Sequence, residues 1–108
     1  MPKKGAVVLV PFPFTDLSGV KVRPAIVISK IPMGEDVIVA FISSKETKVR
    51  KSDVAVLPSK VNGLKSRSLV KCAKIATLEK KIILGELGTL ESSVVKEIDK
   101  KLKFVLGV

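Results

Sequence analysis

Five short apolar runs, each bounded by turn-forming residues, constrain the fold of this chain more than any other feature. The runs are rich in valine and isoleucine, which favour strands, and they are separated by glycine, proline, asparagine, aspartate and serine. They predict strands over residues 5–10, 25–29, 36–42, 53–57 and 68–75. Because no helical segments alternate with these runs, the pattern favours an antiparallel sheet over a parallel arrangement.

The hydrophobic period changes near the C-terminus. After Gly88, apolar residues recur at spacings of three and four, which is typical of a helix with one apolar face. These residues are Val94 or Val95, Ile98, Leu102, Val105 and Leu106. Thr89 or Ser92 is the expected N-cap, and residues 77–87 fit neither period. The predicted fold class is mostly β (β+α), a barrel or half-open sheet packed against one C-terminal helix in a single domain over residues 1–108.

The predicted strands are apolar on both faces, so both faces of a small sheet have to be covered. The helix covers one of them. A second copy of the chain is the expected cover for the other, which predicts a homodimer.

The charge is strongly unbalanced, with 20 lysine and arginine residues against 10 acidic residues and a net charge of +10. Such a surface attracts polyanions. A source that grows at high temperature is an alternative explanation for many lysines, but that adaptation raises glutamate together with lysine, and here acids are half as numerous. The imbalance therefore favours a nucleic-acid partner.

The absence of histidine excludes the Ser-His-Asp and Cys-His arrangements and removes the usual neutral metal ligand. Neither a metal nor a cofactor is expected. Cys72 has no partner for an internal disulfide and alternates with Val70 in a strand, so a buried apolar role is expected. No apolar run approaches the ~20 residues of a membrane-spanning helix, and the N-terminus lacks a signal-peptide core, so a cytoplasmic location without a membrane partner is expected.

Arginine is scarce, and each of the three arginines therefore deserves separate consideration. Arg50 and Arg67 stand in polar, lysine-rich segments. Arg23 stands where a long first loop returns to the sheet, directly before Pro24, whose ring restricts the backbone at the mouth of the fold. By position alone, an ordinary surface arginine at a strand start is the better explanation.

The sequence VVLVPFPFTDLSG at 7–19 is followed by KVRPAIVIS at 21–29 and VAFISS at 39–44. Shorter distinctive segments follow at 63–65, 68–70, 77–78 and 84–85, before the C-terminal helix. Together these segments resemble the MazF/PemK toxin family over essentially the whole chain. The resemblance implies an SH3-like barrel of five to seven short strands, a homodimer, an acidic antitoxin protein as partner, and cleavage of single-stranded RNA without a metal to a 2′,3′-cyclic phosphate.

The same resemblance assigns catalysis to Arg23 and Ser43. In RNA cleavage the 2′-hydroxyl attacks its own phosphodiester, so negative charge has to be stabilised on the phosphoryl oxygens. A guanidinium supplies two parallel hydrogen bonds to such oxygens, and a serine hydroxyl orients the phosphate or stabilises its charge. The expected RNA contacts are phosphate-binding lysines, a hydroxyl and an aromatic ring for base stacking. These residues are Phe12, Lys21, Ser44, Lys45, Lys48 and Lys71.

Three departures from the family pattern support other functions. Ala6 and Ala73 stand where some members carry acidic residues, and Ala76 stands where an arginine is common. A non-catalytic nucleic-acid-binding module of the same fold is therefore the alternative function. A structural subunit of a protein complex is a third.

Overall fold

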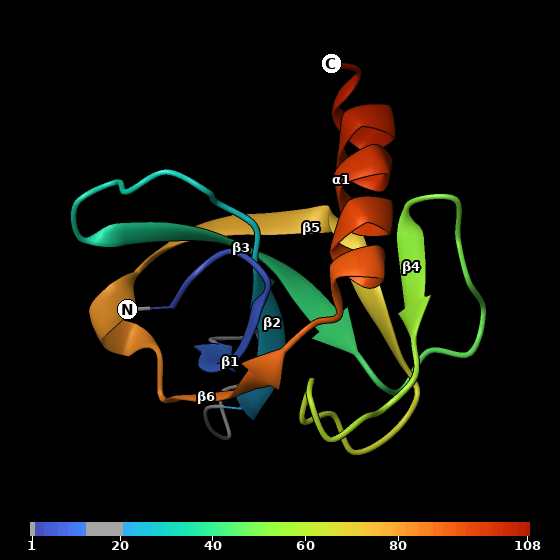
Figure 1. Ribbon diagram of the computed structural model, residues 1–108, viewed down its shortest axis with the longest axis horizontal. Coiled ribbons are helices and arrows are strands. Elements are labelled where there is room, and N and C mark those ends of the chain that lie inside the picture. The colour runs from blue at the N-terminus through green and yellow to red at the C-terminus, as the bar shows by residue number, and fades with distance from the viewer. Residues whose placement is uncertain (1, 13–20) are drawn as a thin grey trace.

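The computed structural model describes residues 2–12 and 21–108, which form six strands, one 3-10 turn and one α-helix. The elements are β1 (Ala6–Phe12), β2 (Lys21–Val27), β3 (Asp36–Ser43), β4 (Asp53–Val56), β5 (Ser68–Glu79), η1 (Lys80–Ile82), β6 (Gly85–Thr89) and α1 (Ser92–Leu106). All six strands belong to one antiparallel sheet with the order β4-β5-β3-β2-β1-β6. The sheet curls into a half-barrel, and α1 packs against β4 and β5 (Figure 1). The predicted mostly β fold with a C-terminal helix is confirmed.

The first two strands differ from their predicted bounds. The prediction placed each proline outside its strand, whereas the observed strands each contain one. β1 continues through Pro11, and β2 begins before Pro24 rather than after it. In the β1–β2 ladder Pro24 pairs with Leu9 and Pro11 with Val22, two steps apart. Residue pairs that use N–H groups alternate with pairs that do not, so both prolines fall in the same kind of pair. Pro24 also precedes Ala25, where pairing with β3 begins.

The segment that fitted neither period, residues 77–87, contains the end of β5, the turn η1 and the start of β6. β5 runs to Glu79 because it pairs with the whole of β3, with a bulge after the pair Ala40↔Ile75. β6 has the sequence GELGT, which carries little strand propensity. It forms a strand because its backbone pairs with β1.

The start of α1 also differs from the prediction. Neither Thr89 nor Ser92 is the N-cap, since Thr89 ends β6 and Glu91 takes the cap position without a side-chain capping bond. The backbone carbonyl of Glu91 accepts hydrogen bonds from Val94 and Val95. At the other end Gly107 adopts a left-handed conformation with φ of 72° and its N–H donates to the Lys103 carbonyl, a common helix stop.

Alternating side chains place two apolar clusters on the two faces of the sheet. In β1, Val7 joins the cluster that includes Ile98 of α1, whereas Val8 and Val10 join the cluster on the opposite face. The partly buried Ile83 packs against that second cluster. Both faces are thus buried within one chain, which explains the apolar strands without a second copy.

Loop residues 57–64 lie against β6 so closely that Gly88 has no space for a side chain. A Cβ at Gly88 would lie 2.2 Å from the carbonyl oxygen of Val61, while at Gly85 in the same strand nothing lies within 4 Å. We expect Gly88→Ala to lower the free energy of unfolding by about 2 kcal/mol, because the loop has to move away from the strand. Gly85→Ala is the matched control and should leave the denaturation midpoint nearly unchanged. Equal midpoints for the two variants would contradict this close packing.

Candidate functional site

The candidate site lies at one end of the sheet, where β2 begins and β3 ends. β2 and β3 are antiparallel, with Ala25 opposite Phe41, so the first residues of β2 and the last residues of β3 share that end. A hollow of about 300 Å³ opens there. It is lined by Lys21, Val22, Arg23, Pro24, Ile42, Ser44 and Lys45. The fold therefore brings together four residues predicted from sequence, namely Lys21, Arg23, Ser44 and Lys45.

Arg23 and Ser43 lie on the same face of the sheet. Arg23 alternates with Ala25 and is half-buried, and Ala25 belongs to the cluster on the face opposite α1. Ser43 alternates with Phe41, which packs against the same cluster. Among the described residues, Ser43 is not part of the lining of the hollow, whereas its neighbour Ser44 is. The two residues assigned to catalysis thus share a face and a sheet end, with Ser44 as a second hydroxyl beside them.

A second hollow, of about 270 Å³, continues the first. Its lining residues are Leu9, Pro24, Ser44, Gly63, Leu64, Lys65, Ser66, Ser68 and Leu87. Pro24 and Ser44 line both hollows, and we call the two together the basic groove. Lys65 and Ser66 were not predicted as site residues, because some 40 positions of sequence separate them from Arg23. The family-like stretch at 63–65 was the one signal that pointed to this wall of the groove.

The loop that forms this wall is held by Asn62, which is fully buried. Its Oδ1 accepts hydrogen bonds from the backbone N–H groups of Ser59 and Leu64, both at 3.0 Å. Its Nδ2 donates to the Leu57 carbonyl at 3.0 Å and to Glu91 at 3.3 Å. The Ser59 hydroxyl also donates to Glu91 at 2.7 Å, and this bond is the main reason why the pKa of Glu91 lies below its ordinary value. The groove wall is therefore shaped before any ligand arrives.

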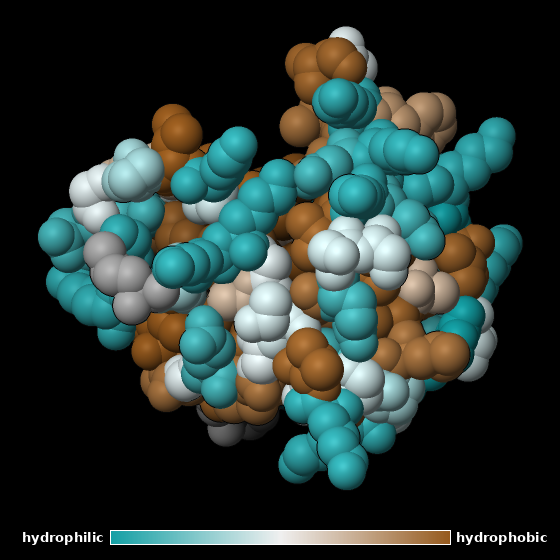
Figure 2. Space-filling view, in the orientation of Figure 1, coloured by the Kyte–Doolittle hydropathy of each residue, from teal (hydrophilic) through white to brown (hydrophobic). Residues whose placement is uncertain are grey.

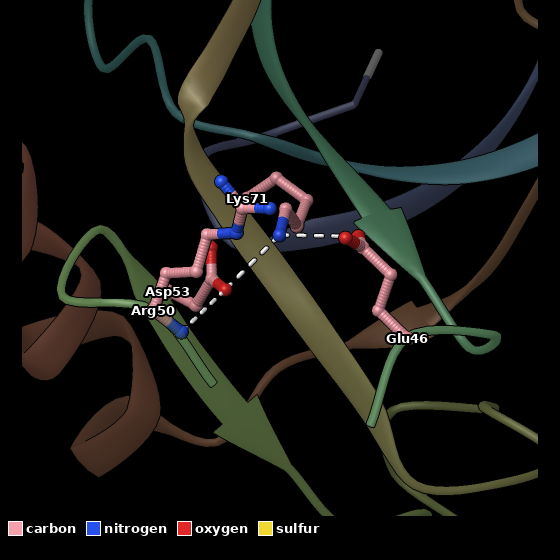
Figure 3. A network of polar contacts seen from close by, with 4 residues as sticks. All are labelled: Glu46, Arg50, Asp53 and Lys71. Carbon is pink, nitrogen blue, oxygen red and sulfur yellow. Dashed lines mark hydrogen bonds and ion pairs between the residues drawn. The ribbon is translucent and has the colours of Figure 1, made fainter. Parts of the chain in front are cut away.

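Lys71 has a different environment from the other predicted phosphate-binding lysines. Its side chain is 7% exposed, and its Nζ lies 3.0 Å from Asp53 Oδ2 and 3.1 Å from Glu46 Oε2 (Figure 3). Burial lowers the pKa of Lys71, but its hydrogen bonds to Asp53 and Glu46 raise it by more, so the net pKa lies above the ordinary value. Two carboxylates thus balance the charge of Lys71 inside the protein. The positive charge of the basic groove comes from Arg23 and from exposed lysines such as Lys21 and Lys45.

The remaining predicted residues have less defined places. Lys48 is exposed in the connection between β3 and β4 but does not line the groove. Phe12 ends β1 opposite Lys21, and its side chain lies outside the described part of the chain.

Cys72 is fully buried, as predicted. Burial, followed by the nearby charge of Asp53, raises the pKa of the Cys72 thiol to about 11. The thiol is therefore protonated at neutral pH and has no nucleophilic role.

Two kinds of feature do not occur among the described residues, 2–12 and 21–108. No group of three or more histidine, cysteine, aspartate or glutamate side chains there is arranged to hold a metal ion. None of the helices there is long and apolar enough to cross a membrane.

A curled antiparallel half-barrel with a C-terminal helix and a basic groove at one end defines the class of this protein as a small β-barrel protein with an anion-attracting site. Residues 3–106 match the model of one family, described as PemK-like, MazF-like toxins of type II toxin–antitoxin systems. The chain belongs to this family. None of the curated proteins matches the sequence.

Solved structures share the fold. A mycobacterial endoribonuclease in complex with its cognate antitoxin is similar with a TM-score of 0.78 and 22% identity, covering 100% of this chain and 97% of that one. MazF from Deinococcus radiodurans has a TM-score of 0.77 and 23% identity, covering 99% and 97%. Mycobacterium tuberculosis toxin MazF-mt6 has a TM-score of 0.77 and 20% identity, covering 95% and 97%. At these identities the likeness establishes the fold.

Proposed function

We propose that this toxin is an endoribonuclease that cleaves single-stranded RNA in the basic groove. The observation that carries the proposal is the hollow in which Arg23 meets Lys21, Ser44 and Lys45. Family membership and the endoribonuclease activity named for two mycobacterial structural neighbours support it. The groove is open, and its positive charges, on Lys21, Arg23, Lys45 and Lys65, lie along both hollows, which suits an extended polyanion. Apolar side chains between these charges, among them Leu64 and Leu87, offer surfaces for the bases.

The proposed reaction is an internal transfer within the RNA. The 2′-oxygen forms a bond to the neighbouring phosphorus and loses its proton, while the bond to the 5′-oxygen breaks and that oxygen gains a proton. The products are a 2′,3′-cyclic phosphate and a 5′-hydroxyl. Arg23 stabilises the charge that develops on the phosphoryl oxygens, and Ser43 orients the phosphate by a hydrogen bond. The reaction needs no metal because the guanidinium supplies the positive charge.

RNA binding is assigned to exposed groups around this centre. Lys21 and Lys45 line the groove, and Lys48 lies on the same connection as Lys45. These three lysines contact phosphates, Ser44 contributes a hydroxyl, and Phe12 stacks on a base. Lys65 and Ser66 extend the contact along the second hollow.

Two protein partners belong to the proposal. An acidic antitoxin covers the basic groove, as expected for a chain with a net charge of +10 whose structural neighbours include a toxin bound to its cognate antitoxin. The second proposed partner is another copy of the chain, which gives a homodimer.

Exposed apolar side chains at the free end of α1 support the dimer (Figure 2). Phe104 is 65%, Leu106 58% and Val108 87% exposed there. Light scattering tests the dimer, and a molar mass of one chain would contradict it.

Incubation of the pure protein with single-stranded RNA in EDTA tests the activity. We expect cleavage without a divalent metal and a 2′,3′-cyclic phosphate on the upstream fragment, detected by mass spectrometry. RNA affinity should also fall as salt rises, because lysines that contact phosphates release counterions. Cleavage that requires a divalent ion, or fragments with a 3′-hydroxyl, would contradict the mechanism.

The alternative is a non-catalytic module that binds RNA in the same groove. Ala6 is buried in β1 and Ala73 is exposed in β5, so neither position supplies the carboxylate that some family members carry. Salt-sensitive RNA binding without cleavage would favour this alternative.

A further inference from the structure

Residues 44–49 carry Ser44 and Lys45 into the basic groove, so their position decides the shape of its first hollow. The connection is fixed where it ends. Asp53 Oδ2 accepts a hydrogen bond from the Arg50 N–H at 2.9 Å, and the Asp53 N–H donates to the Arg50 carbonyl at 3.0 Å. The Cys72 N–H donates to the Ser52 carbonyl at 3.1 Å, which joins the same turn to β5.

The middle of the connection is held by Glu46. Its carboxylate points toward Lys71 on β5, and Lys71 in turn reaches Asp53 (Figure 3). The side chains of Lys71 and Asp53 are 7% and 0% exposed, while that of Glu46 is 41% exposed. Among the described residues, no other ion pair involves residues 44–49. A buried charge pair on β4 and β5 thus holds an exposed carboxylate one residue away from Lys45.

We propose that the Glu46–Lys71–Asp53 triad fixes the positions of Ser44 and Lys45 in the groove, so that both side chains can contact RNA there. This inference rests on the proposed function. This contact differs from an ordinary surface ion pair because Asp53 already holds the Lys71 ammonium in place, so only the Glu46 side chain has to be ordered to form it. Glu46 acts through Lys45 and Ser44 and does not itself touch RNA.

Charge alone and the positioning role predict opposite effects of removing Glu46 on RNA binding, so an experiment can distinguish them. Glu46 places a negative charge beside a groove that attracts phosphates, so its removal should on charge alone strengthen RNA binding. If Glu46 positions the connection, its removal should weaken binding and slow cleavage, since a displacement of about 1 Å near a reacting group costs up to about 100-fold in rate.

The test compares Glu46→Ala with Glu79→Ala. Glu79 is the matched control, because its ion pair with Lys81 at 3.3 Å lies on the surface, with side chains 57% and 76% exposed, and the variant changes the net charge equally. For Glu46→Ala we expect faster amide hydrogen exchange in residues 45–49, RNA affinity at least about threefold weaker than for the control, and a kcat lower by about tenfold. Glu46→Gln, which keeps a hydrogen-bond acceptor for Lys71, should recover part of kcat.

Unchanged exchange in residues 45–49, or a kcat and affinity equal to or above those of Glu79→Ala, would overturn the inference. If the wild-type protein binds RNA but does not cleave it, the proposed catalytic function fails, while exchange and relative affinity still decide the role of the triad. A melting temperature of Glu46→Ala close to that of the control shows that the differences arise locally rather than from unfolding.

Discussion

Arg23→Ala is expected to reduce cleavage of single-stranded RNA by about 100- to 1,000-fold, because it removes the group that stabilises charge on the phosphoryl oxygens. Arg23 is half-buried at the start of β2 and lines the groove beside Lys21 and Ser44. Single-turnover cleavage at saturating protein isolates the chemical step from RNA binding. Arg23→Lys keeps the charge but not the planar fork with two parallel donors, so most of the loss should remain.

Arg50→Ala is the matched control for this experiment. Its side chain is exposed, and its backbone N–H, which donates to Asp53, is retained in the variant. We expect cleavage by Arg50→Ala to stay within a few-fold of the wild type. Circular dichroism and light scattering should show the same fold and molar mass for both variants. Equal cleavage by Arg23→Ala and the wild type would exclude Arg23 as a catalytic residue.

Lys71→Met is expected to lower the free energy of unfolding by about 3–5 kcal/mol, because it leaves the buried carboxylate of Asp53 without its cation. Asp53 is 4% exposed, and its Oδ1 accepts no hydrogen bond from any described residue. Among the described residues, the Arg50 N–H would then be the remaining hydrogen-bond donor to Oδ2. Urea denaturation of the single variant and of Lys71→Met with Asp53→Asn measures the effect.

The second substitution should recover part of the stability, since an uncharged amide tolerates burial better than an unpaired carboxylate. A double variant that is less stable than Lys71→Met would contradict the proposed cause.

The pH dependence of stability gives another check of the role of Lys71. The pKa of Lys71 is raised in the folded state, so its stabilisation is complete below the ordinary value of 10.5 and disappears as the pH rises through the folded-state pKa. The difference between wild type and Lys71→Met should therefore narrow above pH 10.5.

Local sequence patterns predicted most of the sheet because their information is short-range. Runs of β-branched residues placed five strands, and the change of period placed α1. β6 was not predicted, since its residues form a strand through pairing with β1 rather than through their own propensity. The predicted N-cap of α1 was wrong for a similar reason. Glu91 takes that position while its carboxylate bonds Ser59, which is 32 positions away in the sequence.

The residues of the candidate site also fall into two groups, those predicted from sequence and those that were not. Arg23 and Lys21 belong to one segment, and the hydroxyl and lysine at the end of β3 follow from the antiparallel pairing of adjacent strands, so a sequence pattern was enough to group them. Lys65 and Ser66 line the groove in a loop that Asn62 ties to Glu91 at the start of α1 and that the Val61 carbonyl ties to Thr89 of β6. No local pattern specifies that contact.

The sequence by itself determined a short-stranded β-sheet with one C-terminal helix, a surplus of positive charge, and an arginine at the mouth of the first hairpin. Tertiary structure alone decided that Lys65 lines the groove and that Lys71 is neutralised inside the protein. Lys71 stands opposite Asp53 in the β4–β5 ladder, 18 positions away, and Glu46 reaches it from a third segment. The environment of a charged side chain depends on the register of strands far apart in the sequence, and register follows from packing of the whole sheet.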